Sequence, residues 1–350
     1  MMLNKRKSIL IDGRLLTNNP TGIGRIIYEL TKRLLETRNE VTLVQNRKTR
    51  VNEEIWKEKK PKILLTDLNG FNPIHVLRLS LKIYLTKQNY DIIYFPTYSG
   101  LFFKRNSTKV IMNVNDLMFL SIPKFLSQND FLNFIKKNIL YLSIKRSLSQ
   151  SDSILAISLH TQGEILKYFK KKSTHTRLGF NLNGLNTSWS PPYKDYYLYV
   201  GNGRMHKNLD LLCRSFLSSK TSRKLVIIGT ELTKIDHPKI INIPHVSDEQ
   251  LIGYYRNAFC FVFPSIMEGF GIPIIEAFHY CNRIISSSGG SLIEFNDLGV
   301  NYFNPFEEKE LKEYFDNEKA IKELNSNLDV SKIYNWDLYY SSFREKCEIQ

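Results

Sequence analysis

The stretch Pro264–Ala277 reads PSIMEGFGIPIIEA and decides the fold class and the first hypothesis about function. The apolar run Cys260–Phe263 before it predicts a buried strand, and Pro273 is expected as the first residue of a helix, where a missing amide hydrogen costs little. Between them, Gly269 and Gly271 allow the backbone to approach a ligand closely. The helix start offers free amide hydrogens and the positive end of a dipole, which suit an anion or a sugar hydroxyl.

Two carboxylates bracket this turn. Glu268 precedes it, and Glu276 is expected in the first turn of the helix. Charge-assisted hydrogen bonds from vicinal hydroxyls to a carboxylate contribute about 1.5–3 kcal/mol each, so each glutamate could hold a polyol, with phosphate between them. Taken alone, Glu276 would only complement the helix dipole, worth about 0.3–1 kcal/mol. The glycines and the proline between a strand and a helix favour the ligand site.

A second turn carries cations. The predicted strand Tyr197–Val200 leads into Gly201–Asn208, and a helix is expected over Leu209–Leu217. Arg204 and Lys207 stand near the start of that helix, where positive charges oppose the helix dipole. A shared anion such as a diphosphate explains them, and a solvated turn is the alternative.

Strand-like and helix-like segments alternate along the whole chain, which is typical of an α/β protein with parallel sheets. The pattern predicts two Rossmann-like, doubly wound domains, residues 1–186 and 187–335, with a last helix over 336–350 that crosses back to the first domain. The break is expected around Leu185–Lys194. The other expected strands are Ser8–Ile11, Val41–Val44, Asp91–Phe95, Lys109–Val114, Ser153–Ile157, Lys224–Ile228, Ile241–Ile243 and Arg283–Ser286. The other expected helices are Arg25–Glu36, Thr161–Tyr168 with a capping box from Thr161 to Glu164, Asp248–Arg256 and Pro273–Tyr280.

Charge is distributed unevenly between these domains. Residues 1–186 carry 31 Lys and Arg against 13 Asp and Glu, whereas the remainder carries 18 against 21. The basic half could face nucleic acid, an anionic membrane surface or a phosphorylated substrate. Solvated surface lysines in a Lys-rich chain explain the excess equally well.

The location is expected to be cytoplasmic. No apolar run reaches the roughly 18 residues of a membrane span. The N-terminal apolar stretch is interrupted at Asp12, whereas a secretory signal needs a longer apolar core. The four cysteines, Cys213, Cys260, Cys281 and Cys347, are widely spaced and predict buried, reduced thiols.

With these motifs described, the chain resembles the retaining glycosyltransferases of the GT-B fold, family 4, whose E-x7-E signature matches Glu268 and Glu276. The resemblance implies that Glu268 contacts the transferred sugar and that Glu276 contacts the nucleotide ribose. It also implies that sugar hydroxyls meet the backbone that follows the first glutamate, at Gly269, Phe270, Gly271 and Ile272.

The same resemblance assigns roles to the cationic turn and to the nucleotide base. Lys207 and Arg204 would neutralise the leaving diphosphate, and the stretch at Val246 would meet the base. Relatives often carry arginine at the positions of His206 and Asn202, so Arg204 is a displaced candidate.

Two segments in the N-terminal half complete the resemblance. The loop with Gly22 and Gly24 would approach the donor phosphates, and Ile27 in place of a third glycine disfavours a dinucleotide fingerprint. Asn115 stands where relatives commonly have histidine; asparagine can donate a hydrogen bond but cannot shuttle a proton. A plain turn at Asn115–Asp116 is the alternative.

The resemblance implies transfer of a hexose from a nucleoside diphosphate sugar to a glycan or lipid-linked glycan, with retained configuration, in bacterial surface polysaccharide assembly. GDP-mannose is the first expectation for the donor and a UDP-sugar the second, with no cofactor and no metal. Two basic amphipathic segments, Phe131–Arg146 and Leu166–Arg177, would suit docking on an anionic leaflet. The alternatives are another GT-B sugar-nucleotide enzyme such as an epimerase and, much less favoured because the glutamates would be idle, a nucleic-acid-binding protein. A phosphorylase would need a pyridoxal lysine site and a longer chain.

Overall fold

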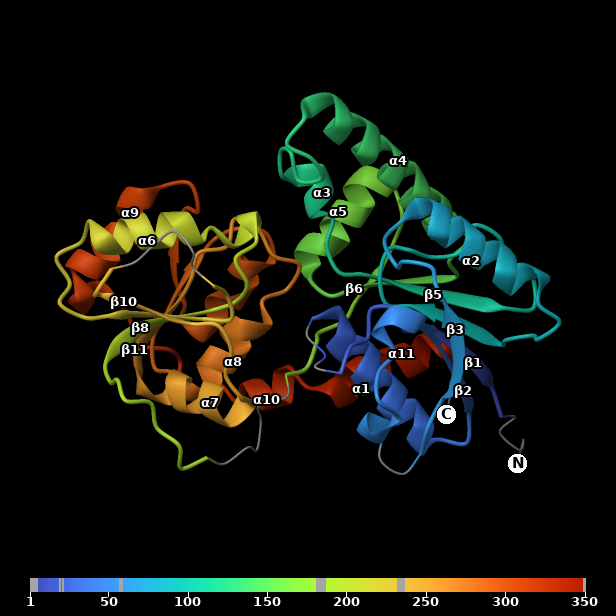
Figure 1. The fold of residues 1–350 in the computed structure, drawn as a ribbon, viewed down its shortest axis with the longest axis horizontal. Helices are drawn as coiled ribbons and strands as arrows, with labels where there is room; N and C mark the ends of the chain where they lie inside the picture. The colour runs from blue at the N-terminus through green and yellow to red at the C-terminus, as the bar shows by residue number, and fades with distance from the viewer. Residues whose placement is uncertain are drawn as a thin grey trace. The chain divides into compact units, whose positions relative to one another are not determined.

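The computed structural model describes residues 6–18, 20, 22–56, 59–180, 187–231 and 237–348. The chain divides into two compact units: Met1–Leu178 with Trp336–Gln350, and Gly179–Asn335 (Figure 1). Of the expected break at Leu185–Lys194, the first two residues lie outside the described part.

In the described residues, the first unit is built on a seven-stranded, all-parallel sheet of order β3-β2-β1-β4-β5-β6-β7. Its strands are apolar runs rich in β-branched residues, which suit a sheet that helices cover on both sides. They are β1 Ser8–Asp12, β2 Glu40–Asn46, β3 Lys62–Thr66, β4 Ile92–Phe95, β5 Lys109–Val114, β6 Ser153–Ala156 and β7 Thr174–His175.

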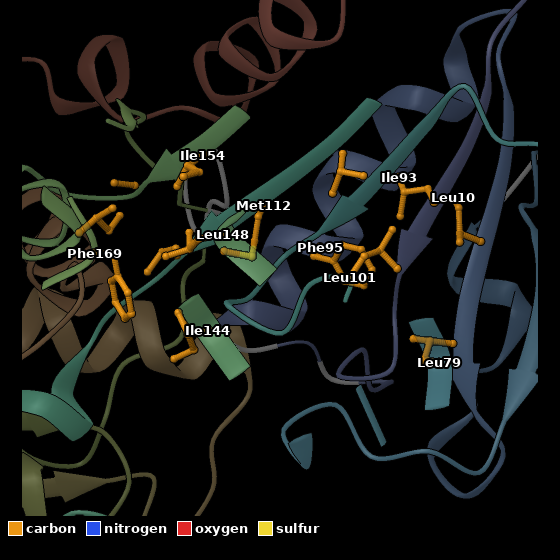
Figure 2. Packing of buried hydrophobic residues seen from close by; sticks show 14 of the residues in the cluster. Leu10, Leu79, Ile93, Phe95, Leu101, Met112, Ile144, Leu148, Ile154 and Phe169 are labelled. Atoms are coloured by element: carbon orange, nitrogen blue, oxygen red, sulfur yellow. The ribbon is translucent and has the colours of Figure 1, made fainter. Parts of the chain in front are cut away.

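Helices cover both faces of this sheet (Figure 1). On one face, Leu79 and Ile83 of α2, Ile144 and Leu148 of α4 and Phe169 of α5 pack with strand side chains in one cluster, part of which Figure 2 displays. On the other face, helices α1 and α11 pack against the strands. The helices are α1 Ile23–Glu36, α2 Pro73–Leu85, α3 Met118–Ser121, α4 Asp130–Ser149, α5 Leu159–Phe169 and α11 Trp336–Cys347.

The capping box predicted from Thr161 to Glu164 is wrong. Helix α5 begins at Leu159, and Ser158 is its N-cap, with the Ser158 side chain accepting the Thr161 amide at 3.1 Å. Thr161 and Glu164 therefore lie inside the helix, where Thr161 donates to the Asn115 carbonyl at 3.2 Å and Glu164 accepts from Ser121 at 2.8 Å.

The second unit repeats the design. Its described residues form a six-stranded parallel sheet of order β10-β9-β8-β11-β12-β13, with α6 and α9 packed together on one face. The strands are β8 Tyr196–Val200, β9 Leu225–Ile228, β10 Ile240–Ile243, β11 Ala258–Phe263, β12 Ile284–Ser287 and β13 Asn301–Phe303. The helices are α6 Leu209–Leu217, α7 Asp248–Asn257, α8 Ile272–Tyr280, α9 Glu308–Asp316 and α10 Val330–Ile333. The prediction of two Rossmann-like sheets is confirmed.

The last helix, α11, belongs to the first unit although it follows the second in sequence. The Tyr339 hydroxyl lies 2.7 Å from that of Tyr94 on β4, and Phe343 meets the Tyr94 ring edge-to-face at 5.1 Å. Phe343 and Cys347 are fully or almost fully buried in the α1 face of the core.

All four cysteines are free and buried, as predicted. No helix in the described part of the chain is long and apolar enough to cross a bilayer.

Replacing Phe343 by alanine should destabilise the first unit by about 3–5 kcal/mol, because a buried aromatic side chain leaves a cavity that the rigid sheet cannot close. Denaturant unfolding of the variant measures this loss. Leu338→Ala is the matched control on the same helix, since Leu338 is 46% exposed. Equal losses for the two variants would contradict the docking of α11 through Phe343.

Candidate active site

The candidate site of the second unit lies where three neighbouring strands end. Strand β8 pairs with β11 and β11 with β12, all in parallel, so their carboxyl ends meet at one edge of the sheet (Figure 1). Residues 201–208, 264–271 and 288–291 follow these ends, and ligands of open α/β sheets bind at such an edge. The two turns singled out in the sequence are thus brought together by adjacent strands.

An ion pair joins these two turns. Lys207 Nζ donates to Glu268 Oε1 at 2.7 Å, and the same Nζ lies 5.1 Å from the centre of the Phe263 ring. Both charged side chains are mostly buried, at 13% and 11% exposed. Removing one partner of a buried pair leaves the other charge poorly solvated, so each side chain holds the other in the site.

Backbone contacts shape the loop that carries Glu268. Glu268 forms an isolated parallel bridge with Gly290, and Ser291 Oγ donates to the carbonyls of Glu268 and Phe270, each at 2.9 Å. A Cβ on Gly289 would lie 1.9 Å from the Ile266 carbonyl oxygen. This third segment, after β12, was not singled out as part of the site, although the run Ser287–Ser291 with its two glycines is a turn signal next to a strand.

Gly271 ends the loop in a conformation that glycine adopts easily. Its φ is 117°, and a Cβ there would come within 2.9 Å of the Leu292 side chain. Helix α8 begins at Ile272, so Pro273 is its second residue and the prediction of a first helical position is wrong by one. Pro273 still lies in the first turn, where its missing amide hydrogen removes no helical hydrogen bond.

Glu276 lies deeper than expected. It is the fifth residue of α8, beyond the first turn, and is 4% exposed. Tyr255 on α7 donates to its carboxylate at 3.4 Å. The hydroxyl contact holds the carboxylate on the inner side of α8, and its predicted ribose contact stays a prediction.

The cationic turn exposes Arg204 and buries His206. The amide of Arg204 donates to the Asn202 side chain at 3.2 Å, which shapes the turn while the arginine side chain is exposed. Burial lowers the pKa of His206, although the nearby Glu268 carboxylate acts in the opposite direction. At neutral pH the positive charge of this turn therefore comes from Lys207 and Arg204. Val246, the predicted base contact, is half-buried just before α7, whose N-cap is Ser247.

The remaining predicted residues belong to the first unit. Gly22 is the exposed N-cap of α1 with φ 48°, and among the described residues other than its chain neighbours no atom lies within 4 Å of where its Cβ would be. Gly24 is buried inside α1, and a Cβ there would lie 3.3 Å from Pro20 Cβ. Thus the absent side chain of Gly22 leaves space at the start of α1, whereas the absent side chain of Gly24 allows the helix to pack closely against Pro20.

Asn115 is buried, with both ends of its amide engaged. Its Nδ2 donates to the Pro96 carbonyl at 2.8 Å, and its Oδ1 accepts from Asn113 Nδ2 at 2.6 Å. Asn113 in turn accepts from Tyr339 of α11 at 3.4 Å. Asn115 thus ties the ends of β4 and β5 together, and contact with a sugar would require it to exchange one of these bonds.

Among the described residues, no group of three or more His, Cys, Asp or Glu is arranged to hold a metal ion.

Comparisons with known proteins agree with this geometry. Residues 188–329, which include both turns, match the family model "Glycosyl transferases group 1". The O-antigen chain mannosyltransferase RfbU of Salmonella typhimurium is 26% identical over 194 residues, which cover 52% of this chain and 53% of RfbU. The match thus spans about half the length of that relative.

Two solved structures have the same fold over almost the whole chain. Sucrose-phosphate synthase from Thermosynechococcus elongatus superposes with a TM-score of 0.70 at 15% identity, covering 98% of this chain and 94% of that one. HepE of Anabaena, solved with UDP and glucose, superposes with a TM-score of 0.68 at 12% identity, covering 99% and 100%. At such identities the likeness concerns the fold, which is GT-B.

The Lys207–Glu268 pair should couple energetically in a double-mutant cycle. Lys207→Met and Glu268→Gln are each expected to destabilise the protein, because each leaves a poorly solvated charge, whereas the double variant should recover about 0.5–3 kcal/mol relative to the sum. Denaturant unfolding of the four proteins measures this coupling. Additive losses would mean that the pair is not formed in solution.

Proposed function

Since residues 188–329 form a domain of the Glycosyl transferases group 1 family, we propose that the protein is a glycosyltransferase. It transfers a sugar from a nucleoside diphosphate donor to an acceptor hydroxyl with retained configuration. The observation that supports this most is the 2.7 Å pair between Lys207, in the turn after β8, and Glu268, in the loop that leads into α8.

The geometry suggests which part of the donor each of the two charged side chains would contact. An ammonium group has three N–H donors, and Glu268 takes one of those of Lys207, which leaves others for phosphate oxygens. The Glu268 carboxylate has further acceptor positions for sugar hydroxyls. We therefore propose that Glu268 and the backbone of 269–272 hold the sugar, while Lys207 and Arg204 face the diphosphate.

In the proposed reaction the bond between the anomeric carbon and the diphosphate oxygen breaks, and the acceptor oxygen bonds to that carbon. The nucleoside diphosphate leaves with the electron pair of the broken bond, so negative charge develops on it, and its phosphate oxygen takes the proton that the acceptor hydroxyl loses. Lys207, Arg204 and the N-terminus of α8 would stabilise this charge from fixed positions, which lowers the barrier without reorganisation. The predicted phosphate contact of Gly22, which belongs to the first unit, stays a prediction, and no metal or cofactor is proposed.

For the substrates we propose GDP-mannose as the first donor to test and UDP-sugars as the second. The O-antigen mannosyltransferase relative supports the first, and the UDP-bound structural neighbour supports the second. The proposed acceptor is a glycan or lipid-linked glycan in the assembly of a bacterial surface polysaccharide (O-antigen, capsule or exopolysaccharide). The proposed place is the cytoplasm or the inner face of the cytoplasmic membrane.

A nucleoside diphosphate should raise the unfolding temperature. At one hundred times its dissociation constant it stabilises the binding unit by about 2.7 kcal/mol, which gives a measurable shift. Thermal unfolding with ADP, GDP and UDP, and then with sugar conjugates of the best one, identifies the base and the sugar. No shift with any of them would contradict the proposed function.

Lys207→Ala should lower transfer or donor hydrolysis on the order of 10²–10³-fold, as loss of one group that stabilises developing charge does elsewhere. Release of the nucleoside diphosphate measures the rate. Lys309→Ala is the matched control, because Lys309 is an exposed cation of the same unit. Equal rates in the two variants would remove Lys207 from the mechanism.

A further inference from the structure

Helix α2 of the first unit presents apolar side chains on its outer side. Its inner side, including Leu79 and Ile83, packs on the sheet. On the outer side Ile74, Leu81 and Leu85 are 65%, 46% and 68% exposed. Helical spacing places them in one stripe. A stripe of this kind is unusual for a surface that only water covers.

Helix α4 repeats this arrangement. Ile144 and Leu148 anchor it to the sheet, while residues 131–142 expose large apolar side chains. These are Phe131 at 71%, Leu132 at 47%, Phe134 at 65%, Ile135 at 36%, Ile139 at 50% and Leu142 at 62%. Both helices therefore have two apolar sides, of which the sheet covers one.

The two stripes form one surface. Helices α2 and α4 cover the same face of the sheet and lie next to each other (Figure 1). The Phe103 ring joins them: it lies 6.3 Å from the Tyr84 ring of α2, and the guanidinium of Arg146 on α4 lies 5.9 Å from its centre. We name these exposed side chains of α2 and α4, with Phe103, the α2–α4 surface.

The charges around the α2–α4 surface are positive except for Asp130, the first residue of α4, which pairs with Lys124 at 3.1 Å. Residues 68–90 and 131–149, which include all of α2 and all but the first residue of α4, hold no Asp or Glu. Arg78, Lys82 and Lys145 are exposed on the two helices and form no ion pair with any described residue. Lys137, by contrast, donates to the Leu120 carbonyl at 2.9 Å and is partly committed within the unit.

We propose that the α2–α4 surface docks on an anionic lipid bilayer. Apolar side chains would enter the region between headgroups and acyl chains, while Arg78, Lys82 and Lys145 contact lipid phosphates. Each basic residue near an anionic surface adds attraction, and apolar burial adds to it. A second copy of this chain fits less well, because a two-fold interface would bring the same cations face to face.

This inference does not depend on glycosyl transfer. Its failure and that of the proposed function are distinguishable, because nucleotide binding is measured without lipid and lipid binding is measured without nucleotide. If both hold, the surface would bring the first unit to a membrane where a lipid-linked acceptor is found.

Flotation with lipid vesicles tests the proposal on the full chain. The protein should float with vesicles of phosphatidylcholine mixed with phosphatidylglycerol, and about tenfold less with phosphatidylcholine alone. Added salt should weaken the anionic binding, because it screens exposed charges. Equal flotation with both vesicles, or none with either, would overturn the proposal.

A paired substitution tests the apolar part. Leu81→Glu with Ile139→Glu should lower vesicle binding at least tenfold, since both side chains would otherwise enter the bilayer. Leu217→Glu with Leu338→Glu is the control of equal charge, because these side chains are 38% and 46% exposed elsewhere. The control should bind as the parent does. Thermal unfolding shows that both variants are folded; equal binding of the two would overturn the assignment.

A triple substitution tests the charges. Arg78→Gln, Lys82→Gln and Lys145→Gln together should remove most of the preference for anionic vesicles. The control neutralises three exposed lysines of the second unit: Lys220, Lys309 and Lys319. An unchanged preference in the triple variant would overturn the role of these cations.

Sedimentation decides between lipid and protein as the occupant. Without lipid, the parent and the Leu81→Glu, Ile139→Glu variant should sediment alike as the same species. An oligomer present only in the parent would assign the surface to a second copy instead. If the protein showed no preference for anionic vesicles and instead bound an acidic protein saturably through the α2–α4 surface, the surface would be assigned to a protein partner.

Discussion

Parallel pairing of β8, β11 and β12 is the constraint on which the candidate site depends. Because parallel strands all end at one edge, the segments after them meet there although they are far apart in sequence. The Lys207–Glu268 pair joins the first two segments, and the bridge from Glu268 to Gly290 joins the second and third. The pair costs desolvation and gains little net stability on its own, so a ligand that uses both charges is the better reason for its presence.

Much of the second unit could be predicted from the sequence, because parallel pairing brings together turns that each have a local signal. Strand ends and turns are local features, and apolar runs such as Leu225–Ile228 leave little choice of secondary structure. The helix Leu209–Leu217 is correct at both ends. Glu268 and Lys207 were expected to contact the sugar and the diphosphate of one donor, and they are found in contact with each other. Contact between them was not predicted, because distance across strands is not encoded in spacing along the chain.

The errors have local physical causes too. Thr161 has the spacing of a capping box, but Ser158 offers the same hydroxyl one turn earlier and directly after the strand. Helix α2 was not predicted because both of its sides are apolar, which weakens the periodic contrast that marks a surface helix. The role of Asn115 stays a prediction, but only the structure reveals that Asn113 and the Pro96 carbonyl occupy its amide.

The second apolar side of α2, which made this helix hard to predict from sequence, is also the best evidence about what covers it. A helix that covers a sheet needs one apolar side, and a second one adds nothing to the stability of the unit while it exposes Ile74 and Leu85 to water. On α4 the second apolar side ends at Lys145 and Arg146. An apolar stripe with cations at its edge, and with Asp130 at one end paired to Lys124, suits an anionic interface. A merely solvated lysine-rich surface would not need the apolar part.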